Sequence, residues 1–384
     1  MTRTLSTPRA ALTDPASTLI LGIDSSCDET AAAVLRGPST VLSNIIASQN
    51  ELHAPYRGVV PEIASRAHAE RIGTVIISAL AAANVTFTDL HAIAVGNRPG
   101  LIGALLVGVS AAKALAWSLD LPLVAVDHVH AHLIAGLLNP SSSSSSSSGA
   151  GVPPASSLPA PTFPALGLVV SGGHTALFRL TSPTDLTLLG STRDDAVGEA
   201  YDKVAAILNL PYPGGPLVDQ RAQRGDPATF PLPISRLEEG SLDFSFSGLK
   251  TAVLYTARGL PPHRNRPATP PMPPTETNLN NLCASFQHAA IDALLLRLAR
   301  AAHQHPDCNT LLAGGGVTAN SLLRARLQQF AAHTGLGLFL PQMQYCVDNA
   351  AMIAALGHRT LLARDWQSDP LTTSATPSGH IALT

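Results

Sequence analysis

The sequence predicts an α/β protein whose two similar lobes face a common cleft. Its 384 residues suit two or three domains, or two halves that share one cleft. Both halves begin alike, with an apolar strand, a turn of small polar residues and a returning apolar strand, at 18–35 and at 165–180. Between and after these openings, short apolar strands alternate with helical segments, which is the pattern of α/β folds.

Changes in composition divide the chain further. A polar lead-in at 1–17 is expected to be disordered, and a weak organelle-transit interpretation of it stays open. A Ser- and Pro-rich break at 140–161 is expected to be a flexible insertion between the halves. Lobe I should therefore cover 18–139, with a closing helix at 346–364 that packs back on it, and lobe II should cover 162–345. A Pro-rich insertion at 259–278 and a flexible tail at 365–384 complete the division.

The composition narrows the classes of function. The formal net charge of −2 gives no general footprint for nucleic acid, so an RNA would need a local positive patch or a partner protein. Four cysteines without CxxC spacing indicate reduced thiols, and we expect a cytoplasmic protein. No apolar run in the sequence reaches the roughly 18 residues of a membrane helix, so we expect no membrane contact.

An acidic turn joins the first two expected strands, Thr18–Asp24 and Ala31–Leu35. Its small hydroxyls and amides could cradle a phosphate, while Asp24 and Asp28 could hold a divalent ion or orient water. The alternative is an ordinary acidic hairpin without a ligand. On this stretch alone, the ordinary hairpin is the favoured interpretation.

A long helix and a glycine-rich loop follow in the first half. Pro61 begins a helix that runs to about Ala83, and Glu62 on this helix suits either a cleft or a solvated face. A strand at 93–96 leads through a loop at 97–101 into a helix at 102–119. The glycines of this loop and helix permit close approach of a neighbouring backbone or of an anion.

Three histidines lie within five positions directly after the apolar run 121–126. With Asp127 as the N-cap of a helix, His128 and His132 stand one turn apart on the same face, which is metal-ligand spacing. Imidazole suits zinc or iron, and at least one more ligand must come from elsewhere. Partly buried histidines that form local hydrogen bonds are the alternative. His130 lies about 160° away around the helix, so it is expected to pack or to support the ligands.

Small polar turns follow apolar strands at 25–30 in the first half and at 171–175 and 314–320 in the second, and a rigid loop at 212–216 precedes the helix that bears Asp219. Together they predict a nucleotide site, in which Asn320 is a specific hydrogen-bonding group. Helices are expected at 204–208, around Asp219, at 279–303 and at 321–333, and strands at 242–250, 310–313 and 338–341. A closing helix begins near Cys346, where Asp348 is either the third metal ligand or simply an N-cap.

The ordered motifs resemble those of the tRNA adenosine threonylcarbamoyltransferases of the TsaD type, once described as O-sialoglycoprotein endopeptidases. The resemblance covers roughly 19–357, and its motifs are GIDSSCDET, GVVPEIASRAH, PGLIGALLVG, the HxxxH of His128 and His132, VSGGHT, DDAVGEAYDK, YPGGP, LDFSFSGLKT, AGGGVTAN and VDNAAMIA. It implies a two-lobed actin/Hsp70/sugar-kinase-like (ASKHA) fold with a metal and a nucleotide in the interlobe cleft. It also implies transfer of threonylcarbamoyl from threonylcarbamoyl-AMP to N6 of adenosine 37, in tRNAs reading codons that begin with A, which gives t6A and AMP.

The resemblance also implies which residues act. His128, His132 and Asp348 would hold one divalent ion, Fe²⁺ in most family descriptions, with zinc as the alternative. The residues implied to bind the adenylate substrate are Val169, Val170, Ser171, Gly172, Gly173, Asp202, Gly215, Asp219 and Asn320. Further polar residues are expected nearby without an assigned role: Asp24, Asp28, Glu29, Glu62, Arg98, His130 and His174. Bacterial members of the family work with an inactive paralogue (TsaB-like) and a small ATPase (TsaE-like).

The chain departs from the family pattern near the histidines. The loop before PGL contains Arg98, where the family usually has Thr-x-Gly-Pro-Gly. His130 stands where many bacterial members have Glu, and Asp127 where they often have a further His. Both histidines of the HxxxH pair are retained.

Three other functions compete with the transferase: a metalloprotease, an actin-like ATPase or kinase, and a non-catalytic scaffold. A zincin-type metalloprotease needs H-E-x-x-H, but Val129 follows His128, so the glutamate base is absent. An actin-like ATPase or kinase explains the glycine turns but not the two histidines with Asp348. A non-catalytic scaffold of the same fold would lack the ligands that this chain retains.

Overall fold

The computed structural model describes residues 14–140, 160–235, 237–260, 262, 267–363 and 370–377. Within them, two sheets and their covering helices confirm the predicted α/β class. The chain forms two compact units: unit 1 is 1–161, 180–186 and 339–384, and unit 2 is 162–179 and 187–338. The serine run 141–148 and the first thirteen residues of the lead-in lie outside the described residues.

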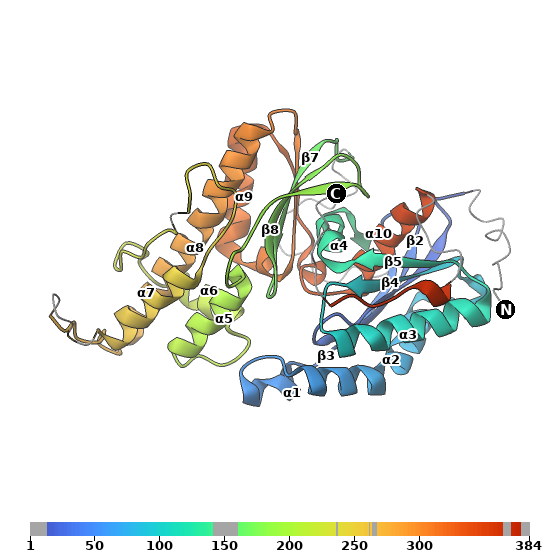
Figure 1. Cartoon of the computed structure of the whole chain (residues 1–384), viewed down its shortest axis with the longest axis horizontal. Helices are drawn as coiled ribbons and strands as arrows, with labels where there is room; N and C mark the ends of the chain where they lie inside the picture. The colour runs from blue at the N-terminus through green and yellow to red at the C-terminus, as the bar shows by residue number, and fades with distance from the viewer. Residues whose placement is uncertain are drawn as a thin grey trace. The chain divides into compact units, whose positions relative to one another are not determined.

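Unit 1 is built on a six-stranded sheet with the order β5-β4-β1-β2-β3-β6 (Figure 1). The strands β1, β2 and β3 pair antiparallel, whereas β4 and β5 run parallel to β1. The carboxyl ends of β1, β4 and β5 therefore meet at one edge of the sheet. The elements are β1 Leu19–Asp24, β2 Glu29–Arg36, β3 Thr40–Ser48, α1 Asn50–His53, α2 Pro61–Ala83, β4 Ala92–Arg98, α3 Ile102–Leu119, β5 Leu123–Asp127, α4 His128–Ile134, β6 Asn139–Pro140 and α10 Ala350–Leu362.

Alternating side chains of β1 face different helices. Leu21 and Ile23 join a core with buried residues of α2 and α3, which pack side by side (Figure 1). Gly22 points to the opposite face, where a Cβ would collide with the backbone of Ala350 in α10. Because strand residues alternate between faces, this one strand is buried by helices on both sides.

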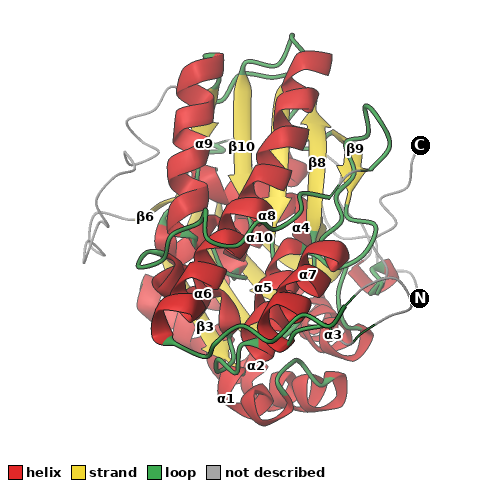
Figure 2. Cartoon of the chain, turned by 90° about the vertical axis from the view of Figure 1, so that its left-hand side faces the viewer, coloured by secondary structure: helices red, strands yellow, loops and turns green. Residues whose placement is uncertain are grey.

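Unit 2 is built on a five-stranded sheet with the order β11-β10-β7-β8-β9. β7 and β10 are parallel neighbours, and α8, which is largely buried, lies along this sheet together with α9 (Figure 2). The elements are β7 Ala165–Val170, β8 Thr175–Leu180, β9 Leu186–Ser191, α5 Val197–Ile207, α6 Gly214–Ala222, α7 Ser247–Arg258, α8 Glu276–Gln304, β10 Thr310–Gly314, α9 Ser321–Thr334 and β11 Gly337–Phe339.

Several expected elements differ in the structure. α5 begins at Val197 instead of 204, where the Val197 amide donates to Thr175 Oγ1 at 2.8 Å. The expected strand at 242–250 is wrong, because only Phe244 forms an isolated bridge, to Thr192, and α7 begins at Ser247. α8 begins at Glu276, inside the expected Pro-rich insertion.

The segment 370–377, expected in a flexible tail, packs against unit 1. It begins with the short helix Pro370–Thr372. The Thr376 amide donates to Asn97 O at 2.9 Å, and the Gly100 amide donates to Pro377 O at 3.2 Å. The tail therefore holds the loop that contains Arg98.

Two helices are long and apolar enough to cross a membrane by length and composition, contrary to the expectation from sequence. They are α3 and α8. The apolar window of α8 is 72% buried, and the inward face of α3 packs on β4 and α2. Burial of this extent makes α8 a core helix, whereas the apolar window of α3 is 33% buried.

Candidate functional site

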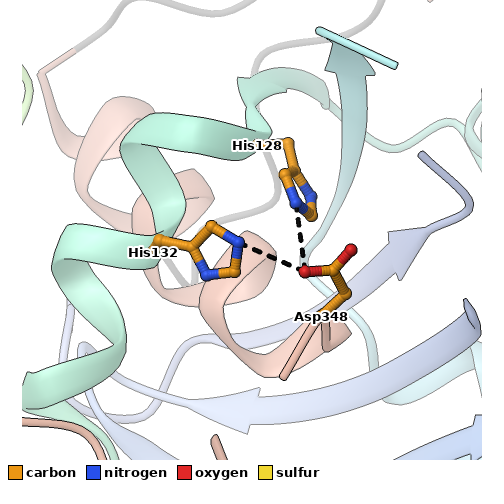
Figure 3. Close-up of side chains that lie close together, drawn as sticks. All are labelled: His128, His132 and Asp348. Carbon is orange, nitrogen blue, oxygen red and sulfur yellow. Dashed lines mark ion pairs between the residues drawn. The ribbon is translucent and has the colours of Figure 1, made fainter. Parts of the chain in front are cut away.

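The helix α4 places two histidines at the edge of the unit 1 sheet. It follows β5 directly, and Asp127 is its N-cap as predicted, because Asp127 Oδ1 accepts from the His130 amide at 3.0 Å. His128 and His132 are both buried, and their ring centroids lie 4.7 Å apart. The spacing on one turn of helix therefore brings both rings to the same place (Figure 3).

Asp348 faces these histidines from the segment before α10. The N-cap of α10 is the next residue, Asn349, whose side chain accepts from the Met352 amide at 3.0 Å. The N-cap interpretation of Asp348 is thus wrong. Its Oδ1 lies 3.4 Å from His128 Nε2 and 3.2 Å from His132 Nε2 (Figure 3).

The chemistry of these three residues fits a divalent metal ion. One ligand atom from each lies within 4.8 Å of the others. Ligands bound to one tetrahedral ion at about 2.1 Å stand about 3.4 Å apart, close to the two distances from Asp348. Among the described residues, neither ring nitrogen of the buried His132 has a hydrogen-bond partner with acceptable geometry, despite the 3.2 Å approach of Asp348. A metal ion bound to His132 Nε2, the nitrogen on the side of Asp348, would give this buried atom a partner.

Burial and the neighbouring side chains shift the pKa values of His132 and Asp348. Burial lowers the pKa of His132, so its ring is neutral and able to bind a metal. Burial alone would raise the pKa of Asp348, but His128 and His132 hold it well below the usual value. Asp348 is therefore a carboxylate, the form that a metal requires.

The acidic turn after β1 lies close to this group. Burial raises the pKa of Glu29 to about 8, with further contributions from Asp28 and Asp348. Burial, followed by Asp348, also raises the pKa of Asp28. Glu62, by contrast, is exposed at the start of α2. His68 is buried in a structural role, with Nδ1 2.7 Å from Thr30 Oγ1 and Nε2 3.0 Å from Cys27 O.

In unit 2, the residues expected to bind the adenylate gather after β7 and β10. These strands are parallel neighbours, so Val169–Gly173 and Gly314–Gly316 leave the sheet at the same edge. Gly315 has φ +99, and a Cβ there would collide with Val170 O. A Cβ at Gly198, in the first turn of α5, would lie 2.6 Å from Ser171 O. Glycine at both positions therefore lets two turns and a helix end meet around Ser171.

A second group of expected substrate residues joins α5, α6, α8 and α9. Asp202 Oδ1 accepts from the Gly214 amide at 2.8 Å, next to Gly215 at the start of α6. Asp219 accepts from the Ser321 amide at 3.1 Å and from Ser321 Oγ at 2.8 Å. Asn320 caps α9, accepting from the Leu323 amide at 3.0 Å.

Gln287, which sequence reasoning missed, connects these residues. It is 2% exposed on α8, accepts from Asn320 Nδ2 at 2.8 Å and donates to Asp219 Oδ1 at 3.1 Å. Tyr201 OH lies 3.4 Å from the same Gln287 oxygen. The signal for Gln287 in the sequence was an amide side chain within the apolar middle part of α8. The His174 amide donates to Ser171 Oγ at 3.1 Å and closes the turn after β7.

The family model of TsaD, described as tRNA N6-adenosine threonylcarbamoyltransferase, matches residues 40–355 of this chain. The chain belongs to the TsaD family. A relative from Bacillus subtilis with the name tRNA N6-adenosine threonylcarbamoyltransferase is 46% identical over 339 residues, covering 88% of this chain and 89% of its own. A relative of the same name from Moorella thermoacetica is 46% identical over 360 residues, covering 94% and 96%.

Two solved structures align with this TsaD member at much lower sequence identity. The (R)-2-hydroxyglutaryl-CoA dehydratase component A of Acidaminococcus fermentans aligns with a TM-score of 0.48 at 11% identity, covering 90% of this chain and 100% of that one. Full-length HypF aligns with a TM-score of 0.45 at 13% identity, covering 92% and 57%.

Membership of the TsaD family decides among the competing functions. The chain is a tRNA-modifying transferase of the threonylcarbamoyl type, as predicted, and not a metalloprotease or an actin-like kinase. The family acts on tRNA, and the described residues include a His-His-Asp group that could hold a metal ion.

Two departures from the TsaD pattern meet in the structure. Arg98 Nε lies 3.3 Å from Asp127 Oδ2, so the arginine pairs with the N-cap carboxylate of α4. His130 points elsewhere: it is buried, its Nε2 donates to Pro183 O at 3.0 Å, and burial lowers its pKa to about 4. His130 is thus a neutral packing residue, while Arg98 supports the helix that carries both candidate ligands.

Proposed function

We propose that this chain transfers threonylcarbamoyl from threonylcarbamoyl-AMP to N6 of adenosine 37, in tRNAs reading codons that begin with A, and that His128, His132 and Asp348 hold the metal ion used in that transfer. The observation that supports the metal centre most strongly is the convergence of three buried or partly buried ligand atoms within 4.8 Å. The relatives' shared name supports the activity. The two lines of support are independent.

The transfer of threonylcarbamoyl requires a site that positions the adenylate and the N6 amine of adenosine next to each other. The N6 amine attacks the carbamoyl carbon of a mixed carbamic-phosphoric anhydride, the bond from that carbon to the phosphate oxygen breaks, and AMP leaves. The amine loses one proton in forming t6A. A bound divalent ion supplies Lewis acidity and a template for substrate oxygens. AMP is a good leaving group, so positioning of the weak nucleophile is the main demand on the protein.

The adenylate would be held by unit 2. Amides of Gly172 and Gly173 suit the phosphate, because neither position has any atom within 4 Å of where a Cβ would lie. Asp219 and Asn320 suit the nucleoside, and Gln287 fixes the direction of both side chains. These roles agree with the residues carried over from the family motifs.

Two imidazoles and one carboxylate suit both iron and zinc, and we infer Fe²⁺ as the ion in the cell. We further infer a cytoplasmic enzyme that works with a TsaB-like paralogue and a TsaE-like ATPase. Exposed apolar residues on two helices of unit 1 support a protein partner, since Ile77 on α2 is 62% exposed and Leu106 on α3 is 50% exposed. A partner would also compensate for the net charge of −2 when tRNA binds.

The test of the metal centre is removal and reloading of the ion. Metal-free protein should form no t6A, and one equivalent of Fe²⁺ under anaerobic conditions should restore the activity. The variant His132→Ala should bind less than one equivalent and should not recover. Full activity of the metal-free wild type, or recovery of His132→Ala to the wild-type rate, would contradict the proposed role of the metal.

A further inference from the structure

Asp24 contacts His128, one of the two candidate histidine ligands, at the ring nitrogen that does not lie near Asp348. It ends β1 at the edge where β4 and β5 also end, and its side chain is 1% exposed. Its Oδ2 lies 3.0 Å from His128 Nδ1, and Ser26 Oγ lies 3.1 Å from the same nitrogen. We propose that Asp24 is a positioning residue that orients His128 for metal binding, an inference that rests on the metal centre proposed above.

The argument depends on which ring nitrogen carries the proton. An ionised carboxylate only accepts hydrogen bonds, so the short contact with Asp24 requires a proton on His128 Nδ1. When a metal ion takes the place of the proton on the other nitrogen, the lone pair that binds it is on Nε2, the atom that lies 3.4 Å from Asp348 Oδ1. A carboxylate that fixes the tautomer and ring direction of a metal-binding histidine also raises its basicity as a ligand.

Gly96 keeps the Asp24 carboxylate in place. Gly96 lies on β4, the parallel neighbour of β1, and a Cβ there would lie 2.7 Å from Asp24 Oδ1. Asp24 Oδ1 is buried and has no hydrogen-bond partner among the described residues. The carboxylate is therefore positioned by its contact with His128, by the Ser26 hydroxyl, which donates to Asp24 Oδ2 at 3.4 Å, and by the space that glycine leaves.

His132 has no comparable support. Its ring is fully buried, but its Nδ1 has no hydrogen-bond partner in the described part of the chain. Packing alone orients this ring, whereas hydrogen bonds orient His128. Disturbing Asp24 should therefore weaken metal binding through His128 and leave the pocket of His132 intact.

The experiment measures Zn²⁺ affinity of the full-length, metal-stripped protein by competition with a chromophoric chelator, without tRNA or adenylate. The variants are Asp24→Asn, Gly96→Ala and Ser26→Ala, with His128→Ala as the reference for a lost ligand. Ser25→Ala is the matched control. The Ser25 hydroxyl is buried next to Ser26, donates to Ala104 O at 2.8 Å and accepts from the Gly108 amide at 3.1 Å, both within the fold. The absorption of bound Co²⁺ reports the ligand geometry.

We expect Asp24→Asn to weaken Zn²⁺ binding about 10- to 100-fold. Gly96→Ala should act in the same direction because it displaces the carboxylate, Ser26→Ala should have a smaller effect, and Ser25→Ala should lower thermal stability without changing the affinity. The Co²⁺ spectrum of Asp24→Asn should also differ from that of the wild type.

Unchanged affinity in both Asp24→Asn and Gly96→Ala would overturn the proposal, as would an equal loss in Ser25→Ala. Because no substrate is present, failure to form t6A in a separate assay would contradict the proposed function and leave this inference standing. Unchanged affinity in His128→Ala would overturn both the metal centre and the role of Asp24.

Discussion

Asp348 can face the histidines because its neighbour, Asn349, takes the capping role. The fully buried Asn349 accepts from the Met352 amide and donates to Val347 O at 2.8 Å, which holds the turn on both sides of Asp348. A sequence with Asp and Asn in succession does not reveal which residue caps the helix, since both are good caps. Because Asn349 caps the helix, the Asp348 carboxylate is available to bind a metal.

Replacing Asn349 by Ala should therefore affect two properties. The free energy of unfolding of the metal-free protein should fall by about 1–2 kcal/mol, because the cap and a buried hydrogen bond are lost. Metal affinity should fall as well, because the turn that directs Asp348 loosens. Urea denaturation and a Zn²⁺ titration measure the two effects. Unchanged stability of Asn349→Ala would argue against the capping role.

Glu29 gives the metal-free protein a distinct pH dependence. Burial, with Asp28 and Asp348, raises its pKa to about 8, whereas an unfolded chain has a Glu pKa of about 4.3. Between these values the folded state retains a proton that the unfolded state has released. The free energy of unfolding should therefore fall as pH rises through this window, by at most about 1.4 kcal/mol per pH unit.

Glu29→Gln should flatten this dependence, and urea denaturation between about pH 5 and pH 8 measures it. Glu62→Gln, at an exposed site on α2, controls for the removal of a charge. If wild type and Glu29→Gln lose stability in parallel as pH rises, Glu29 is not the group responsible.

At the scale of elements, α4 is a short helix that depends on its N-terminus. Asp127 caps it with one carboxylate oxygen and pairs with Arg98 through the other. All seven of its residues are buried, so a change at the cap displaces both candidate ligands. Two of the three departures from the family pattern, Arg98 and Asp127, are thus explained together, as partners in one ion pair.

Substitutions at Asp127 separate the contribution of the helix cap to stability from that of the ion pair with Arg98. Asp127→Ala should lower the free energy of unfolding by about 1 kcal/mol through loss of the cap. Asp127→Asn keeps a capping oxygen and should cost less. The ion pair itself should contribute below about 1 kcal/mol, because the Arg98 side chain is 57% exposed. In the Asp127→Asn background, Arg98→Ala should have no further effect, and additive losses in urea denaturation would refute the pairing.

Elements with strong local signals could be predicted from the sequence. Pro61 at the first position of α2 and the apolar run of α3 marked both helices at the residues where the structure has them. The start of α5 could not be predicted, because a hydroxyl from β8 satisfies its first amide. The predicted alternation at 242–250 covers a loop up to Phe246 and the first turn of α7. Asp194 fixes this loop by accepting from the Phe246 amide at 2.8 Å.

In the candidate site, too, some residues could be predicted from local patterns and others could not. The spacing of His128 and His132 was visible, and the family motifs supplied Asp348. Gln287 could not be found, since its partners Asn320 and Asp219 are far away in the sequence and meet it only after α6, α8 and α9 pack. Local patterns identify ligands, whereas the residues that orient them depend on tertiary contacts.

At the scale of the whole molecule, the two kinds of site residue belong to different units. The candidate metal ligands are all in unit 1, and the residues expected to bind the adenylate are all in unit 2. Effects of substitution should therefore separate. Gln287→Ala should weaken AMP binding about threefold to tenfold, as expected for the loss of one or two hydrogen bonds, and should leave Zn²⁺ affinity unchanged.

Calorimetric titration of AMP and chelator competition for Zn²⁺ measure the two affinities. His132→Ala is the reciprocal variant, with weaker Zn²⁺ binding and unchanged AMP binding. Gln304→Ala, on the last turn of the same helix α8, is a control for damage to that helix. Equal losses of AMP affinity in Gln287→Ala and Gln304→Ala would contradict the proposed role of Gln287.

The most direct measurement is transfer itself. Wild-type protein with its partner proteins is incubated with preformed threonylcarbamoyl-AMP and an unmodified tRNA transcript, and the nucleosides are analysed by mass spectrometry. The predicted result is t6A at adenosine 37 with release of AMP, no t6A on a transcript with guanosine at position 37, and only background t6A for folded His132→Ala and Asp348→Ala. Absence of t6A with the wild type, or wild-type amounts of t6A from both variants, would contradict transfer at a metal centre formed by these residues.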